Sequence, residues 1–205
     1  LDCCNDFSIV VNALKEKGLI GLEKISITPG SPLKVMLAVK ENTFEDAFKQ
    51  VGKPAAVEHK LDGFRLQIHK NNDKVSLFTR QLENVTLQFP DVVKAVLKYV
   101  KAKNVILDSE AVGVDSKGKF LSFQNISQRI KRKYDIELLV KSLPIHLHVF
   151  DILYYNNKNL LNIPFQERHK ILSEVIGQSD MVRLVNQIIT SDEAEAEQFY
   201  KEALK

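Results

Sequence analysis

The chain has 205 residues, of which 44% are hydrophobic, and its formal net charge is +3 at pH 7. This length suits one full domain and a piece of another, and the apolar content is enough for a buried core. The longest apolar runs end well short of the roughly 20 residues that a membrane span needs, so none is expected. The small net charge does not by itself indicate a polyanionic partner, because such partners bind clusters of charge.

The start of the chain, LDCCNDFSIV, lacks the basic, apolar and small-residue order of a signal peptide. The only two cysteines, Cys3 and Cys4, are neighbours, which suits neither a disulfide framework nor a zinc site. We therefore expect a reducing, intracellular setting. Because the chain does not open with Met, we expect it to be a fragment of a longer protein.

The first part of the chain predicts a helix followed by a linker. The helix covers residues 5–17, with Asn5 or Asp6 as its cap, because apolar residues recur at helical spacing before a glycine. Two prolines and a glycine then punctuate Ile27–Pro32. Such residues break regular structure, so we place a domain boundary near Thr28.

A short helix and three strands are expected next. Thr43–Val51 has apolar residues at positions i, i+3, i+4 and i+7, which is typical of a helix that covers a sheet. From there the apolar period changes toward two, and strands are expected at Ala56–Lys60, Arg65–His69 and Val75–Thr79. The polar run Asn71–Asp73 supplies a turn, so the last two strands predict a hairpin.

The rest of the chain mixes helices and strands without the regular rhythm of a parallel sheet. The expected helices are 91–101, capped by Asp91, 122–142, which is mostly helical, 164–176 and 191–205. The expected strands are 104–114, 144–155 and 181–185, with a turn at 116–118. This mixture predicts an α+β fold with largely antiparallel sheets flanked by helices.

A lysine in the segment EHKLDGFR is a candidate nucleophile. Lys60 stands at a strand end, the turn residues Asp62 and Gly63 follow, and Arg65 begins the next strand. A lysine amine attacks phosphorus only when neutral, and a free lysine has a pKa of about 10.4, so positive charge or a dry site is required nearby. The alternative is a solvated hairpin loop, and spacing alone does not decide between them.

The segment HKLDGFR resembles the K-x-D-G-x-R signature of the covalent nucleotidyltransferases, which include DNA ligases, RNA ligases and mRNA capping enzymes. Three further segments resemble the signatures of this group in the correct order. They are LFTRQLENVTLQFPDV from Leu77, VILDSEAVGVD from Val105 and HVFDILYYNNKNL from His148. Their joint occurrence makes the resemblance specific.

The connecting segments FQNISQRIKRK and PFQERHKIL resemble the ATP-dependent DNA ligases of archaea and eukaryotes in particular. This resemblance implies that residues 29–205 form the first part of a nucleotidyltransferase, or ATP-grasp-like, adenylation domain that is incomplete at its C-terminus. Residues 1–28 would be the tail of a preceding helical DNA-binding domain. Later ligase signatures, E-G-[LIV]-M-[VI]-K and K-x-K, are absent, so we expect no ligation by this fragment alone and weak or no self-adenylation.

The resemblance implies a three-step reaction in which Lys60 takes AMP from ATP, passes it to a DNA 5′-phosphate, and the 3′-hydroxyl of the nick displaces it. Mg²⁺ is the implied metal, because phosphoryl transfer relies on neutralising charge that spreads over oxygens. Nicked double-stranded DNA is the implied partner, and a sliding clamp is a further candidate. The protein would act as a monomer in replication, repair and recombination, in the cytoplasm or in a eukaryotic nucleus.

Six residues receive roles by similarity. Lys60 is the nucleophile, Glu58 would sit at the adenine edge, and Arg65 would reach the sugar and phosphate region. Arg80 would contact the nucleotide or the nicked phosphate, Glu110 would hold the ribose or Mg²⁺, and Phe150 would stack on adenine.

The structural alternatives for neighbouring residues remain open. Asp108 lies two residues before Glu110, so both should share a face of the strand and could suit a metal. Alternatively, Asp108 makes a salt bridge at the strand end. The alternative for Phe150 is a core phenylalanine. Asp62 and Gly63 are expected to shape the turn that presents the lysine.

The densest positive cluster comprises Arg129, Lys131, Arg132 and Lys133. These residues could bind DNA phosphates, or they could form a solvated helix face. The histidines show no zinc-site spacing. Two rival functions are an RNA ligase or capping enzyme, which would use RNA ends or GTP, and a non-catalytic DNA-binding module.

Overall fold

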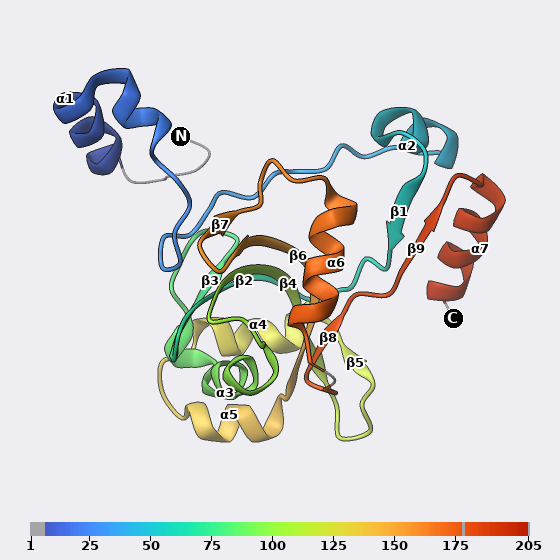
Figure 1. Cartoon of the computed structure of the whole chain (residues 1–205). Coiled ribbons are helices and arrows are strands. Elements are labelled where there is room, and N and C mark those ends of the chain that lie inside the picture. Colours follow the sequence, from blue (N-terminus) through green and yellow to red (C-terminus); the bar gives the residue numbers. More distant parts are fainter. Residues whose placement is uncertain (1–6, 178, 205) are drawn as a thin grey trace. The chain divides into compact units, whose positions relative to one another are not determined.

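The computed structural model describes residues 7–177 and 179–204 (Figure 1). These residues form two compact units, which are described separately. The large unit combines the described residues up to Val35 with Asp62–Leu184. The small unit combines Met36–Leu61 with the described residues from Val185 onward. No helix in the described ranges is long and apolar enough to span a membrane.

A seven-stranded sheet forms the centre of the large unit, in the order β3-β2-β4-β6-β7, with β5 beside β4 and β8 beside β6. Every pair is antiparallel except β6 with β8. The predicted α+β class is therefore confirmed. The strands are β2 (Phe64–Asn71), β3 (Lys74–Thr79), β4 (Asn104–Val114), β5 (Phe120–Leu121), β6 (Ile145–Tyr155), β7 (Lys158–Asn159) and β8 (Val182–Leu184).

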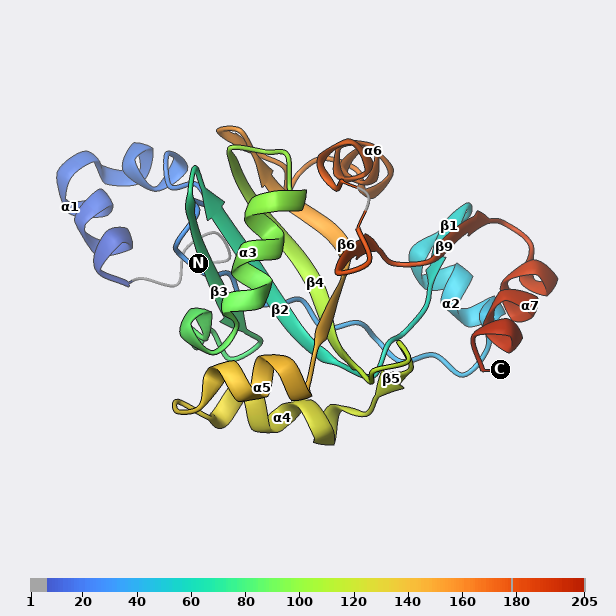
Figure 2. The ribbon, with the colours of Figure 1, turned by 90° about the horizontal axis from the view of Figure 1, so that it is seen from below.

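Four helices accompany this sheet, and three of them contribute residues to its main apolar core. Figure 2 shows α3 lying across the strands and α4 beside α5. Alternation on β4 places Val105 and Leu107 in this core, together with Val96 of α3 and Leu172 of α6. The helices are α3 (Pro90–Tyr99), α4 (Phe123–Lys131), α5 (Ile136–Ser142) and α6 (Phe165–Val175).

The predicted linker is bound to the other face of this sheet. Ile27 and Leu33 pack in a second apolar cluster with Ile106 and Tyr154. The backbone N–H of Gly30 donates to Nδ1 of His69 at 2.9 Å, and that of Leu33 donates to the side-chain oxygen of Gln67 at 2.8 Å. The segment from residue 27 to 33 therefore packs against the large unit, and the domain boundary near Thr28 stays a prediction.

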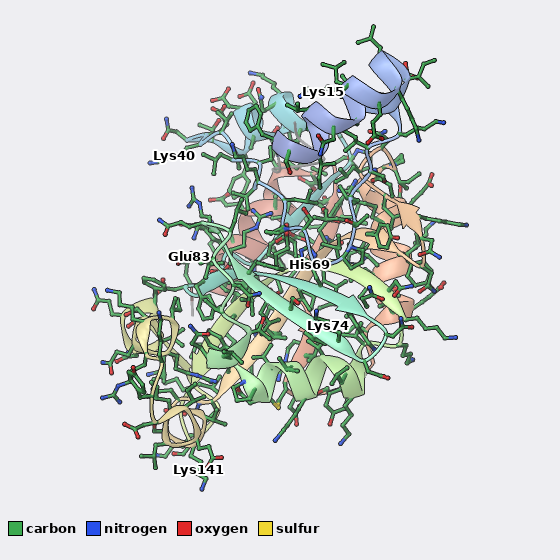
Figure 3. The ribbon with its side chains drawn as sticks, turned by 90° about the vertical axis from the view of Figure 1, so that its left-hand side faces the viewer. Lys15, Lys40, His69, Lys74, Glu83 and Lys141 are labelled. Atoms are coloured by element: carbon green, nitrogen blue, oxygen red, sulfur yellow. The ribbon has the colours of Figure 1, made fainter. Side chains whose placement is uncertain are left out.

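His69 is held in one tautomer by these contacts. Nδ1 accepts from the Gly30 backbone, so Nε2 carries the proton and donates to the Gln67 side-chain oxygen at 2.9 Å. The ring is 1% exposed and lies within the structure in Figure 3. Burial lowers the pKa of His69 from 6.5 to about 4.

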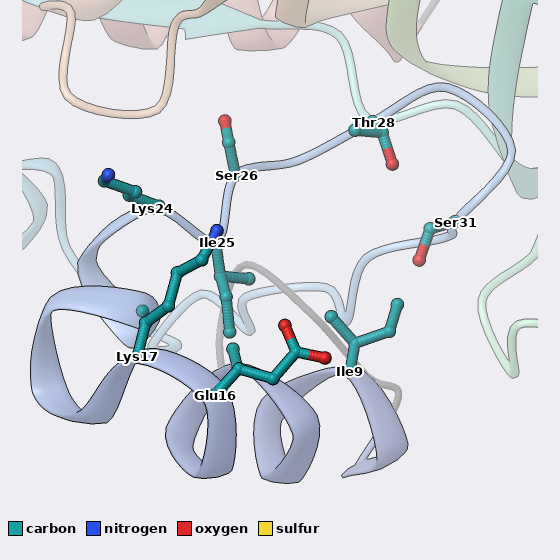
Figure 4. A pocket seen from close by; sticks show the side chains of 10 residues that line it. Ile9, Glu16, Lys17, Lys24, Ile25, Ser26, Thr28 and Ser31 are labelled. Atoms are coloured by element: carbon teal, nitrogen blue, oxygen red, sulfur yellow. The ribbon is translucent and has the colours of Figure 1, made fainter.

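The first helix, α1 (Phe7–Glu23), is longer than predicted. It continues through a kink at Gly18, where φ is 59° and ψ is −149°, a conformation that glycine tolerates. The caps predicted at Asn5 and Asp6 lie outside the described residues. A hollow of about 380 Å³ lies between α1 and the segment from residue 24 to 31 (Figure 4).

The small unit contains a two-stranded antiparallel sheet, β1 (Ala55–Glu58) with β9 (Gln187–Thr190). Helices α2 (Phe44–Val51) and α7 (Glu193–Ala203) accompany it. Thr43 caps α2 as its sequence predicts, and Asp192 caps α7. The strand predicted at Ala56–Lys60 thus ends earlier, at Glu58, and pairs with a strand that the sequence analysis did not predict.

Candidate functional site

An ion pair on the sheet of the large unit contains Arg65, one of the residues predicted to bind the nucleotide. Arg65 on β2 is the Cα partner of Glu110 on β4, which places Asp108 at the diagonal position on the same face. Arg65 binds Asp108 through two hydrogen bonds, one of them from Nε at 2.9 Å. The Arg65 guanidinium also lies 5.4 Å from the centre of the Phe150 ring. Arg65, Asp108 and Phe150 therefore form one cluster.

Burial and charge act in opposition at this pair. Burial lowers the pKa of Arg65, but its hydrogen bonds to Asp108 and the attraction of that carboxylate outweigh this effect, and the pKa is raised. Glu110 and Asp151 add further attraction. The Asp108 side chain is 3% exposed, and burial raises its pKa against the opposing effect of Arg65. Asp108 thus makes a salt bridge, as the second alternative predicted, but it lies inside β4 and not at the strand end.

A second ion pair lies next to the first. Asp151 of β6 is the Cα partner of Asp108, and it accepts two hydrogen bonds from Arg168 of α6 at 2.8 and 2.9 Å. Arg168 also donates to the backbone oxygen of Ile163 at 2.5 Å. This pair fastens α6 to the sheet beside Phe150, so Asp151 has a structural role.

The candidate nucleophile belongs to the small unit. Lys60 is exposed and follows the end of β1 by two residues. Glu58, the last residue of β1, accepts a hydrogen bond from the side-chain nitrogen of Gln187 at 2.7 Å. The His59 ring packs on the Phe199 ring of α7, with centroids 4.6 Å apart. Gln187 could not be found from the sequence, because local pattern does not specify the partner of its β-strand.

The two turn residues after the lysine belong to the large unit. Asp62 accepts a hydrogen bond from the backbone N–H of Phe123, the first residue of α4, at 3.3 Å. Its partner is thus a helix terminus that is distant in the sequence. A Cβ on Gly63 would lie 2.3 Å from the backbone oxygen of Ala111, so the close approach to β4 requires glycine.

Arg80 lies in the loop that follows β3, and it is exposed. The loop is closed by the backbone of Thr79, whose N–H donates to the Glu83 oxygen at 3.0 Å. No described contact joins Arg80 to the cluster around Arg65, so its predicted role stays a prediction.

A family model described as "ATP dependent DNA ligase domain" matches residues 35–205. The chain belongs to this family. A DNA ligase of Nanoarchaeum equitans is 49% identical over 97% of this chain, which is 35% of that protein. DNA ligase 2 of Methanosarcina acetivorans is 43% identical over 98% of this chain and 36% of that protein. This chain thus spans about a third of the length of these relatives.

Solved structures support the same fold for the ligase chain. The ligase domain of LigD from M. tuberculosis has a TM-score of 0.57 and 24% identity, covering 83% of this chain and 50% of that one. An archaeal ATP-dependent RNA ligase has a TM-score of 0.51 and 13% identity, covering 84% of this chain and 42% of that one. At these identities the likeness concerns the fold alone.

The four residues of the basic cluster differ in their exposure to solvent. Lys131, Arg132 and Lys133 are exposed. Arg129, in contrast, is 0% exposed and binds Asp91 through two hydrogen bonds at 2.6 and 3.0 Å. Arg129 is therefore removed from the predicted DNA-binding residues, because its guanidinium is enclosed by protein.

The predicted cap of the helix at 91–101 is also wrong. The N-cap residue of α3 is Phe89 and not Asp91.

The carboxylates of this chain could hold Mg²⁺ only together with substrate phosphates and water. Within the described ranges, no group of three or more His, Cys, Asp or Glu side chains could hold a metal ion. Mg²⁺ is commonly bound by one or two carboxylates together with substrate phosphates and water. Glu110 is half-buried and suits such a role, whereas both oxygens of Asp108 bind Arg65.

Proposed function

We propose that this chain carries the nucleotide-binding and nucleophilic residues of an ATP-dependent DNA ligase that seals nicks through a lysyl-AMP intermediate. The observation that carries the proposal is the family match across residues 35–205, which contains the whole K-x-D-G-x-R segment and every other proposed site residue. The Arg65–Asp108 pair beside Phe150 supports it, because it holds a cation and an aromatic ring on one sheet face.

In the first step, the neutral amine of Lys60 attacks the α-phosphorus of ATP. A nitrogen–phosphorus bond forms, the bond from that phosphorus to the bridging oxygen breaks, and pyrophosphate leaves with the electron pair. The amine nitrogen loses a proton to solvent. A 5′-phosphate oxygen of nicked DNA then attacks the phosphorus of the bound AMP, the nitrogen–phosphorus bond breaks, and the Lys60 nitrogen takes up a proton as it leaves. Finally the 3′-hydroxyl oxygen bonds to the 5′-phosphorus and loses its proton, and AMP leaves with the electron pair of the broken oxygen–phosphorus bond.

The roles of the other residues follow from their chemistry. Glu58 accepts from the adenine edge, and Phe150 stacks on the base. Arg65 binds the sugar and phosphate region of the nucleotide, and its hydrogen bonds to Asp108 fix the orientation of the guanidinium. Arg80 contacts the nucleotide or the nicked phosphate. These assignments are proposals that rest on the resemblance of the motifs.

Mg²⁺ is part of the proposal, and it would neutralise charge on the phosphates and on the leaving pyrophosphate. Glu110 would hold it or the ribose.

Nicked double-stranded DNA is the proposed partner. Lys131, Arg132 and Lys133 are exposed and adjacent in sequence, so each is available to neutralise a phosphate. We extend the same proposal to binding of a sliding clamp, a monomeric state, and roles in replication and repair inside the cell.

A nick-sealing assay tests the function. The complete product of the gene that encodes this chain is incubated with Mg²⁺ and a duplex that carries one nick, either in DNA or in RNA, with ATP or GTP as the nucleotide. The proposal expects sealing of DNA with ATP. Sealing of RNA alone would support an RNA ligase, and transfer of GMP would support a capping enzyme. DNA binding without any covalent nucleotide would support a non-catalytic module.

A further inference from the structure

A cross-strand pair in the small unit joins Glu58, which is proposed to bind the nucleotide, to Gln187, which belongs to none of the sequence motifs. Glu58 and Gln187 are Cα partners in the antiparallel pairing of β1 with β9. The Gln187 side-chain nitrogen Nε2 donates to Oε1 of Glu58 at 2.7 Å. Both residues are half-buried. The bond is therefore short and partly shielded from water.

The backbone around this pair is fixed by further contacts. The N–H of His59 donates to the backbone oxygen of Asn186 at 3.2 Å, which extends the pairing by one residue toward Lys60. The packing of the His59 ring on Phe199 fastens the same end of β1 to α7. Glu58 and Gln187 are thus held opposite one another, and a side-chain bond between them has a defined direction.

We propose that Gln187 is a positioning residue that aims the Glu58 carboxylate at the exocyclic amino group of an aminopurine nucleotide. The inference rests on the proposed function, in which Glu58 contacts the base. The terminal torsion of a glutamate is broad, so an unrestrained carboxylate adopts many directions. Gln187 reduces this freedom by holding Oε1.

The chemistry of the pair favours adenine over a 6-oxopurine. An ionised carboxylate only accepts hydrogen bonds, and its two oxygens offer about four lone-pair sites, so it accepts from Gln187 and from a base amino group together. A 6-oxo group is itself an acceptor and would face the carboxylate without a proton between them. Sites that are built to bind one polar group reject analogues that lack it.

The chain contains a matched control for this bond. Gln198 of α7 donates to Glu202 at 2.7 Å, the same length as the Gln187–Glu58 bond. That pair is exposed on a helix surface and contains no proposed nucleotide residue. Gln198→Met therefore removes an equivalent amide donor in the same unit.

The test measures covalent AMP formation on Lys60 in the complete gene product. The initial rate is followed for ATP and for purine riboside triphosphate, which lacks the 6-amino group, and kcat and KM are separated. Gln187→Met keeps the side-chain length without the donor. We expect its preference for ATP over the analogue to fall about 10-fold, mainly through a higher KM for ATP. Gln198→Met should retain the wild-type preference to within about twofold.

The ratio between two nucleotides is taken on one protein sample, so a partly unfolded variant does not distort it. Gln187→Glu serves as a second variant of the same size, and it should lose the preference as well, because two carboxylates then face each other. An unchanged ratio in both Gln187 variants would overturn the inference and leave the proposed function standing. A wild-type protein that forms no AMP adduct on Lys60 would refute the proposed function, and this inference with it.

Discussion

Replacement of Arg129 by methionine should destabilise the large unit strongly. Its guanidinium is buried and binds both oxygens of Asp91, at 2.6 and 3.0 Å. It also donates to the backbone oxygens of Leu143, at 3.0 Å, and Gln88, at 3.2 Å. The Arg129 side chain lies 4.6 Å above the Phe89 ring. One residue therefore joins α4 to the start of α3 and to the end of α5.

The magnitude follows from what the variant leaves behind. Asp91 is 11% exposed, so Arg129→Met would leave a poorly solvated carboxylate without its cation. Breaking a buried ion pair by removing one partner costs about 3 to 5 kcal/mol. The two backbone oxygens that lose their hydrogen-bond donor add to this cost. We therefore expect the free energy of unfolding to fall by about 4 kcal/mol. The double variant Arg129→Met with Asp91→Leu should recover part of this loss, because neither charge is then buried alone.

Urea denaturation followed by far-ultraviolet circular dichroism measures the change. Arg132→Met is the matched control: it removes an exposed arginine three residues away and should change the free energy of unfolding by no more than about 0.5 kcal/mol. If Arg129→Met were as stable as Arg132→Met, the structural role of Arg129 would be refuted and a DNA-binding role would have to be reconsidered.

Three further predictions concern other parts of the large unit. Gly63→Ala should abolish most AMP formation and lower the melting temperature, because the new Cβ would lie 2.3 Å from the Ala111 oxygen; wild-type rates would contradict this. His69 has a pKa of about 4 in the fold and an ordinary value of 6.5, so its neutral form stabilises the fold fully above pH 6.5. Unfolding free energy should fall by about 3 kcal/mol as the pH drops from 6.5 to 4, and His69→Gln should flatten this dependence. Replacing Lys131, Arg132 and Lys133 by methionine should reduce the slope of log affinity for nicked DNA against log salt by roughly 3 units; an unchanged slope would remove these residues from the DNA surface.

The sheet of the large unit could be predicted well from local pattern. The expected strand 104–114 coincides with β4, and the turn at Asn71–Asp73 correctly predicted the β2–β3 hairpin. Alternation and turn residues are local signals, so they are visible without knowledge of the fold. The pairing of β1 with β9 joins segments that are distant in the sequence, and no local signal specifies such a partner.

The site was predictable only in part, for the same reason. The motif resemblance predicts roles for Lys60 and Arg65, but the bond between Arg65 and Asp108 depends on the register of β2 with β4. Arg129 belongs by sequence to a basic run, yet it lies on the apolar face of α4 with Ile126 and Ile130. Its spacing from these isoleucines was a signal of burial, but its partner Asp91 could be identified only from the folded structure.

The location of the AMP adduct decides whether Lys60 is the nucleophile. The complete gene product is incubated with ATP and Mg²⁺, digested, and analysed by mass spectrometry of its peptides. We expect one AMP on Lys60, and none on the Lys60→Arg variant, which keeps the positive charge and cannot supply a neutral amine. AMP carried by another residue, or retained in full by Lys60→Arg, would show that Lys60 is not the nucleophile.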